Sequence, residues 1–268
     1  MNSFAAMLKY DLKNGIVRQK MVYMVAFLLN GVALIKFDNI DKQLEYGPYD
    51  CLAYLFEGMY PYVPNVGSPF IVPIVWFSVM MIPAFLIGNY ANNDLSGYGS
   101  HIILKSKNKS VWFASKVVWC LLSVIIYFLF LVVLTYGFSY LYGGKTEVGI
   151  DKWKLCNGFF RNIAEKDVIV FTVIMPLITM ITCSILQLAI SLIVSTQAAY
   201  ISIAAFYVMS AYFTNTLFVG NYSMMYKNEY ISMGSGINLH NQCIVCGIII
   251  LISIAVSFVV VKKRDIYR

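Results

Sequence analysis

Residues 89–116 read NYANNDLSGYGSHIILKSKNKSVWFASK, the one long polar and basic segment between two extended apolar runs. Asp94, Gly97 and Gly99 precede a short apolar run at residues 101–104. Lysines then follow at Lys105, Lys107, Lys109 and Lys116. A plain connection between two membrane spans needs only a few residues, so this segment has room for a short helix with its own apolar face. We expect that helix to lie against another protein; the alternative is a solvated loop that is basic because cytoplasmic loops are rich in lysine and arginine.

The composition sets the class of protein. The chain has 268 residues, of which 60% are hydrophobic and 12% are charged, and its mean hydropathy is +0.72. Soluble domains carry about twice that charged fraction. We therefore expect an all-α polytopic membrane protein in which residues 1–268 form a single transmembrane domain. We attribute the net charge of +7 to basic residues at the cytoplasmic ends of spans, where membrane lipid is the expected partner. Nucleic acid is not expected as a partner.

Six apolar runs are long enough, or nearly so, to cross a hydrocarbon core that requires about 20 helical residues. Because backbone groups must be satisfied within lipid, each is predicted to be a helix. The runs lie near residues 21–37, 68–90, 117–140, 168–194, 199–219 and 243–261, with a cytoplasmic loop at 91–116. A tight turn is expected at residues 195–198, and a merger of the fourth and fifth runs into one helix would give five spans instead.

Residues 1–20 have the pattern of an amphipathic helix at the membrane interface. Apolar side chains recur every four residues, at Phe4, Leu8, Leu12 and Ile16. Lysines share another face, at Lys9, Lys13 and Lys20. A secretory signal peptide is the competing interpretation, but no small-residue cleavage site follows the apolar run, so a retained anchor is favoured.

Charge predicts the orientation. The N-terminal helix, the central loop and residues 262–268 carry most of the excess of lysine and arginine, which places both termini and the central loop in the cytoplasm. The segment 143–167 is also basic and is placed outside by parity. The outer loop at 38–67 is rich in tyrosine, as expected at headgroup depth, and a ligand-binding aromatic patch is the minority interpretation. The outer loop at 221–242 is long enough to dip back into the membrane. Cys51 and Cys156 lie in two different outer loops and are candidates for a disulfide if the compartment is oxidising.

Several chemistries are excluded by their missing parts. Gly143-Gly144-Lys145-Thr146 resembles the end of a phosphate-binding loop, but Ser139 stands where the first glycine is required. The two histidines, His101 and His240, fall on opposite sides of the predicted membrane, so neither a catalytic nor a metal site is expected. Polar or aromatic side chains within or beside the spans are either pathway-lining residues or contacts between helices: Asn30, Trp76, Gln187 and Asn215.

The layout resembles the membrane permease subunits of bacterial type-2 ABC exporters over the whole chain. In that family an acidic residue and a glycine precede a short apolar coupling helix, a polar or basic turn follows, and a lysine stands at the start of the third span. In this chain those places are taken by Asp94, Gly97 or Gly99, Ile103, Leu104, Ser106 and Lys116. The chain departs from the pattern in having Asn93-Asp94 where the family often has Glu-Arg, and in lacking a proline in this loop.

The resemblance implies a subunit of an export pore in the bacterial cell membrane that pairs with a second permease copy or a paralogue. It further implies that a separate ABC ATPase subunit holds ATP and Mg²⁺, so this chain is not itself an enzyme and needs no cofactor of its own. The substrate implied is an antimicrobial peptide of the lantibiotic type, a drug or a lipid. The implied ATPase-coupling residues are Asp94, Gly97, His101, Ile102, Ile103, Leu104 and Lys105.

A second class of function stays open from the residues alone. A membrane scaffold or immunity protein that binds a partner without transporting anything would show the same apolar runs. It would not need the coupling-helix pattern, and it would tolerate a charge at Ile103 or Leu104. A membrane enzyme would need polar clusters within the spans, which the sequence does not offer.

Overall fold

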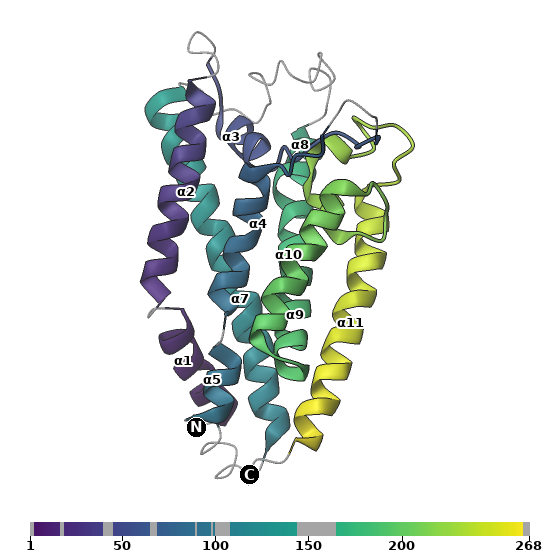
Figure 1. The fold of residues 1–268 in the computed structure, drawn as a ribbon. Coiled ribbons are helices and arrows are strands. Elements are labelled where there is room, and N and C mark those ends of the chain that lie inside the picture. The colour runs from purple at the N-terminus through teal and green to yellow at the C-terminus, as the bar shows by residue number, and fades with distance from the viewer. Residues whose placement is uncertain are drawn as a thin grey trace.

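The computed structural model describes residues 3–16, 19–39, 45–64, 69–88, 90–97, 99, 108–143 and 165–264. The elements within these ranges are helices, and the long ones run side by side as a bundle (Figure 1). In the first half of the chain they are α1 (Ser3–Gly15), α2 (Lys20–Asp38), α3 (Pro48–Leu55), α4 (Ile74–Ile87), α5 (Tyr90–Ser96), α7 (Lys109–Phe138) and η2 (Ser139–Gly143). The second half contains α8 (Glu165–Ile169), η5 (Val170–Ile174), α9 (Met175–Ile193), α10 (Thr196–Tyr212), η6 (Val219–Ser223), η7 (Met225–Lys227) and α11 (Leu239–Lys263).

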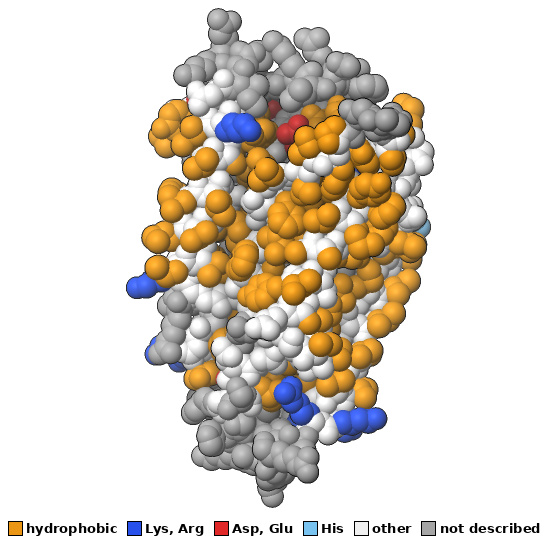
Figure 2. All heavy atoms as spheres, in the orientation of Figure 1, with side chains coloured by type: hydrophobic (Ala, Val, Ile, Leu, Met, Phe, Trp, Pro, Cys, Tyr) orange, Lys and Arg blue, Asp and Glu red, His pale blue; other side chains and the backbone are white. Residues whose placement is uncertain are grey.

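Within the described ranges, five helical stretches are long and apolar enough to cross a membrane: Lys20–Asp38, Ile74–Leu95, Lys109–Tyr142, Lys166–Ile193 and Leu239–Lys263. Figure 2 shows apolar side chains spread over the length of this face of the bundle, with most lysine and arginine side chains toward its two ends and one on the left edge nearer the middle. Such a surface would be unfavourable in water and is matched to a hydrocarbon environment. The architecture therefore fits a multi-pass membrane protein.

Several helix ends differ from those predicted by hydropathy. The second run was predicted over 68–90, but α4 begins after Pro73 and stops at Gly88, whose backbone φ is +42°. The third helix begins at Lys109, eight residues before the predicted 117, because the Asn108 side chain accepts a hydrogen bond from the Val111 backbone N–H and caps it. The Asn238 side chain likewise accepts a hydrogen bond from the Asn241 backbone N–H and caps α11, so the last helix starts before the predicted 243. Capping residues, rather than the limits of the apolar runs, set these boundaries.

The fourth and fifth runs are separate helices. α9 ends at Ile193 and α10 begins at Thr196, where the Ser195 hydroxyl accepts a hydrogen bond from the Ala198 backbone N–H. α10 has 17 residues, so it ends well before the predicted 219. The chain that follows α10 folds back onto it as η6, and Asn221 Nδ2 donates to the carbonyls of Phe213 and Asn215 at 2.9 Å each.

The described residues around α3 are closely packed. All eight residues of α3 are buried, although the sequence predicted an outer loop over 38–67. Of the tyrosines expected at headgroup depth, Tyr46 and Tyr54 are buried against Phe37, with ring centroids 5.2 and 4.9 Å from it, whereas Tyr60 is exposed. Cys51 is buried in α3, and its candidate partner Cys156 lies outside the described residues.

Lys227 fixes the fold-back after α10. It was predicted to lie in a polar outer loop, yet its side chain is buried, and its Nζ donates to the carbonyls of Ser210 and Ala211 at 2.7 Å each. It also donates to Asn221 Oδ1 at 3.1 Å. These carbonyls belong to the last turn of α10, where the helix dipole favours a cation. Burial lowers the pKa of Lys227 to about 8, so the group is still mainly charged at neutral pH.

We expect Lys227→Met to lower the free energy of unfolding by about 1–3 kcal/mol, because buried carbonyls at the end of α10 would lose their donor. The measurement is thermal unfolding of the purified chain in detergent. The matched control is Lys166→Met on α8, where the side chain is exposed and the same loss of charge should change little. Equal melting temperatures for the two variants would contradict the capping role.

Candidate functional site

A buried ion cluster lies where the central loop leaves the bundle. Lys116 on α7 places its Nζ 2.5 Å from Asp11 Oδ1 on α1 and 2.6 Å from Asp94 Oδ2 on α5. The exposed fractions of Lys116, Asp11 and Asp94 are only 1%, 1% and 7%. One ammonium is therefore shared by two carboxylates from elements far apart in the sequence, and it joins three helices at a single point.

Aromatic side chains complete the cluster. The Tyr90 hydroxyl donates to Asp11 Oδ1 at 2.8 Å, and Trp112 Nε1 donates to Asp94 Oδ2 at 2.9 Å. The Lys116 ammonium also lies 4.7 Å from the centre of the Tyr90 ring and 5.3 Å from that of Trp112. Both distances are within the range of a cation–π contact. The aromatic groups thus exclude water from the charges while bonding to them.

The position of Asp11 follows from the face that α1 turns inward. Met7, Asp11 and Gly15 are buried and spaced by four residues, which places them on one face of the helix. A Cβ atom at Gly15 would come within 2.6 Å of Trp119 Cε2, so glycine permits the close approach of α1 to α7. The stripe predicted to face the membrane is Phe4, Leu8, Leu12 and Ile16, and the structure leaves these side chains only half-buried.

Asp94 is held by the turn that ends α5. The Gly97 backbone N–H donates to the Asp94 carbonyl at 3.1 Å. Gly99 then lies directly against Asp94, since a Cβ atom there would stand 2.7 Å from the Asp94 Cγ. On the same helix, Asn92 Nδ2 donates to the Ser191 carbonyl at 2.7 Å and to Thr196 Oγ1 at 2.9 Å. α5 is therefore anchored both to the cluster and to the turn between α9 and α10.

The electrostatics of the cluster are demanding. Burying a charge costs several kcal/mol unless partners compensate it, and here two carboxylates share one ammonium. Among the described residues, Asp11 Oδ2 and Trp119 Nε1 are buried polar atoms without a hydrogen-bond partner. The arrangement depends most on α7, because displacing Lys116 leaves two buried carboxylates without their cation, whereas α1 and α5 each contribute one carboxylate to the cluster.

The predicted coupling residues divide between the described and undescribed parts of the chain. Asp94 and Gly97 are at the base of the loop, next to the cluster. The other five lie outside the described residues: His101, Ile102, Ile103, Leu104 and Lys105.

The candidate pathway-lining residues serve mainly as contacts between or within elements. Asn30 Nδ2 donates to the Ala26 carbonyl one turn back on α2, and Gln187 Nε2 donates across from α9 to the Ala84 carbonyl at 2.9 Å. Trp76 Nε1 donates to Ser223 Oγ at 3.0 Å. Asn215 is exposed in the turn after α10, where its side-chain oxygen accepts a bond from Leu217.

Sequence reasoning missed part of the site. Lys116 was identified as a basic residue of the loop and as the lysine at the start of the third span, but Asp11 was not singled out and no pairing between the two was predicted. One signal in the sequence was usable: Asp11 is four residues from both Met7 and Gly15, which places a carboxylate on a face otherwise made of apolar or small residues. Among the described residues no group of three or more histidine, cysteine, aspartate or glutamate side chains is arranged to hold a metal ion.

In the part of the chain that the structure describes, the elements are helices, five stretches fit membrane crossing, and a buried charge cluster lies at one end. Residues 22–267 match a family described as a protein of unknown function, DUF2705, and the chain belongs to this family. Comparison with curated proteins and with solved structures finds no match.

We expect Lys116→Met to lower the free energy of unfolding by about 3–5 kcal/mol, because it leaves two carboxylates buried without their cation. The triple variant Asp11→Asn, Asp94→Asn, Lys116→Met removes all three charges and should regain much of that loss. Denaturant unfolding in mixed micelles, followed by tryptophan fluorescence, measures both changes.

The matched control is Lys13→Met, also a lysine on α1's end of the bundle but exposed. It should change the free energy of unfolding by no more than a few tenths of a kcal/mol. If the single and triple variants are equally unstable, then the charges of the cluster are not coupled and the lysine contributes by packing alone.

Proposed function

We propose that the chain is the permease subunit of an ATP-driven exporter of the type-2 ABC class, in a bacterial cell membrane. The arrangement of the helices supports this proposal. Five stretches have the length of membrane spans, and α10, with 17 residues, would extend about 26 Å at the usual helical rise. With α10 as a sixth span, both termini and the central loop lie on one side. The start of α1, the end of α11 and α5 are at the same end of the bundle in Figure 1.

The ion cluster is the observation that carries the proposal. Asp94 precedes the predicted coupling segment and Lys116 follows it, and their contact at 2.6 Å closes the base of the loop. A partner that moves residues 100–107 would therefore move α5 and the start of α7 together. The bond from Lys116 to Asp11 adds α1 to the same unit. A simple connection between two spans needs no such fixed base.

The proposed mechanism divides the work between chains. A separate ABC ATPase subunit binds ATP with Mg²⁺, closes on itself and pushes the coupling helix, for which Ile102, Ile103 and Leu104 provide the apolar face. The movement shifts the permease from one conformation to another. Binding of ATP and of the ATPase can cause this shift only if their binding free energy differs between the two conformations. A second copy or a paralogue supplies the other half of the pathway. The proposed substrates are antimicrobial peptides, drugs or lipids.

We expect a tagged chain purified from its native host in mild detergent to bring down an ABC ATPase subunit, and Leu104→Asp to abolish that recovery. A carboxylate in the apolar contact would have to be buried without a partner. Mass spectrometry identifies the partner, and ATP hydrolysis by the same sample confirms that it is active.

The matched control is Leu217→Asp, which makes the same substitution at an exposed position after α10, at the opposite end of the bundle. It should leave the ATPase recovery unchanged. Recovery of no ATPase with the unmodified chain would favour instead a scaffold or immunity protein that binds its partner without transport. Recovery that survives Leu104→Asp would show that the ATPase contacts another surface.

A further inference from the structure

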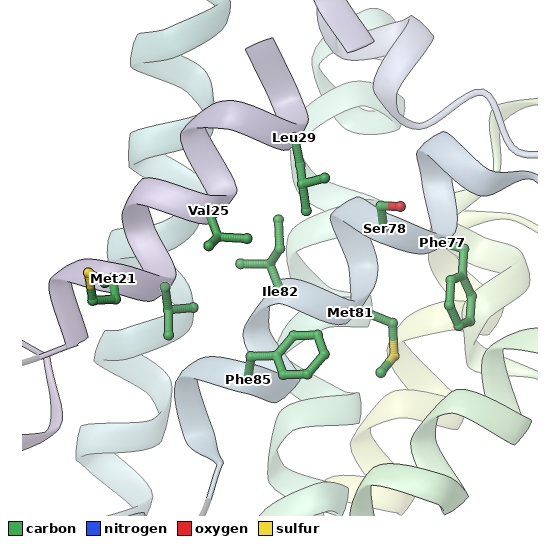
Figure 3. A pocket seen from close by; sticks show the side chains of 9 residues that line it. Met21, Val25, Leu29, Phe77, Ser78, Met81, Ile82 and Phe85 are labelled. Atoms are coloured by element: carbon green, nitrogen blue, oxygen red, sulfur yellow. The ribbon is translucent and has the colours of Figure 1, made fainter. Parts of the chain in front are cut away.

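An apolar groove of about 440 Å³ runs along the bundle between α2 and α4. Figure 3 shows Val25 and Leu29 of α2 facing Ile82 of α4, with Phe77, Met81 and Phe85 placed along α4. Eight of its nine lining residues are apolar. The ninth, Ser78, donates its hydroxyl to the Ile74 carbonyl at 2.7 Å and offers no free donor to a ligand. The lining is Met21, Val22, Val25, Leu29, Phe77, Ser78, Met81, Ile82 and Phe85.

The shape of the groove favours a thin occupant. Met21 and Leu29 are eight residues apart on α2, or about 12 Å at the helical rise of 1.5 Å per residue. A second helix is about 10 Å across, including its side chains, and does not enter a volume of this size. An extended hydrocarbon chain does, and its methylene groups need no hydrogen-bond partner.

The charge at one end of the groove identifies the rest of the ligand. Lys20 is the first residue of α2, directly before the lining residue Met21, and its side chain is exposed. Lys9 and Lys13 are also exposed on α1, which lies beyond this end of α2 in Figure 1. A positive group beside an apolar slot matches a lipid whose headgroup carries a net negative charge.

We propose that this groove is a binding site for an anionic glycerophospholipid, with one acyl chain between α2 and α4 and the headgroup phosphate on Lys20. The site does not depend on the proposed exporter function. α2 contributes little to the protein core, since only 22% of its apolar window is buried. A bound acyl chain would supply the packing that the protein itself leaves out between α2 and α4.

The test is photolabelling of the full chain in lipid nanodiscs. The probes are phosphatidylglycerol and phosphatidylcholine that carry the same diazirine-bearing acyl chain, and the labelled peptides are mapped by mass spectrometry. Phosphatidylglycerol should label the α2 and α4 lining more strongly than phosphatidylcholine. Lys20→Gln should reduce the phosphatidylglycerol label about fivefold, which corresponds to the loss of about 1 kcal/mol for one lysine at the membrane surface.

A filled groove provides the second arm. Val25→Trp places a large side chain in the groove and should abolish labelling by both lipids, whereas Val32→Trp, on the same helix but outside the lining, should leave it unchanged. Both positions are exposed, so neither variant overpacks the core. Equal labelling of the lining and of the exposed apolar face of α11 would overturn the proposal in favour of non-specific lipid contact, and cross-links between two copies of the chain would assign the groove to a dimer contact.

Discussion

The buried ammonium group of Lys116 organises the end of the bundle that holds α1 and α5, which we propose faces the cytoplasm. Lys116 binds Asp11 and Asp94 at once, and so joins α1, α5 and α7 at one point in addition to their apolar contacts. α1 has 13 residues, a length at which an isolated helix is marginal in water, and α5 has only seven. Both are stabilised by what they bury against α7, and the charges specify which arrangement satisfies all three. A purely apolar contact would hold the helices together but would tolerate sliding that the ion cluster forbids.

The long apolar helices were predictable from the sequence because hydrophobic runs of this length leave few alternatives to a membrane-embedded helix. Their ends were not, because single side chains such as Asn108 and Asn238 determine where a helix begins, whatever the hydropathy of the residues that follow. α10 shows that hydropathy does not determine where a helix ends either. Its apolar pattern continues to residue 219, but the backbone leaves the helix at Tyr212 so that η6 can pack back against it.

The candidate site was predicted in part. Asp94 and Gly97 were identified from their place before the short apolar run, which is local information. The pairing of Asp11 with Lys116 joins residues 105 positions apart, and no local pattern specifies such a contact. The same holds for Lys227, which was interpreted as a charge in an outer loop and instead caps α10 from within the core. Charged residues follow the general rules of membrane topology on average, and the exceptions are those that find a buried partner.

The break at Gly88 affects how movement can spread through the molecule. Its φ of +42° belongs to a backbone region that residues with side chains rarely adopt, and it separates α4 from α5. α5 is thus a helix separate from α4, and the ion cluster binds it to α7 and, through Lys116, to α1. α7, by contrast, is one helix of 30 residues that extends from the cluster toward the opposite end. A movement imposed on the start of α7 would thus be carried across the bundle by one continuous helix, whereas the break at Gly88 would separate α4 from that movement.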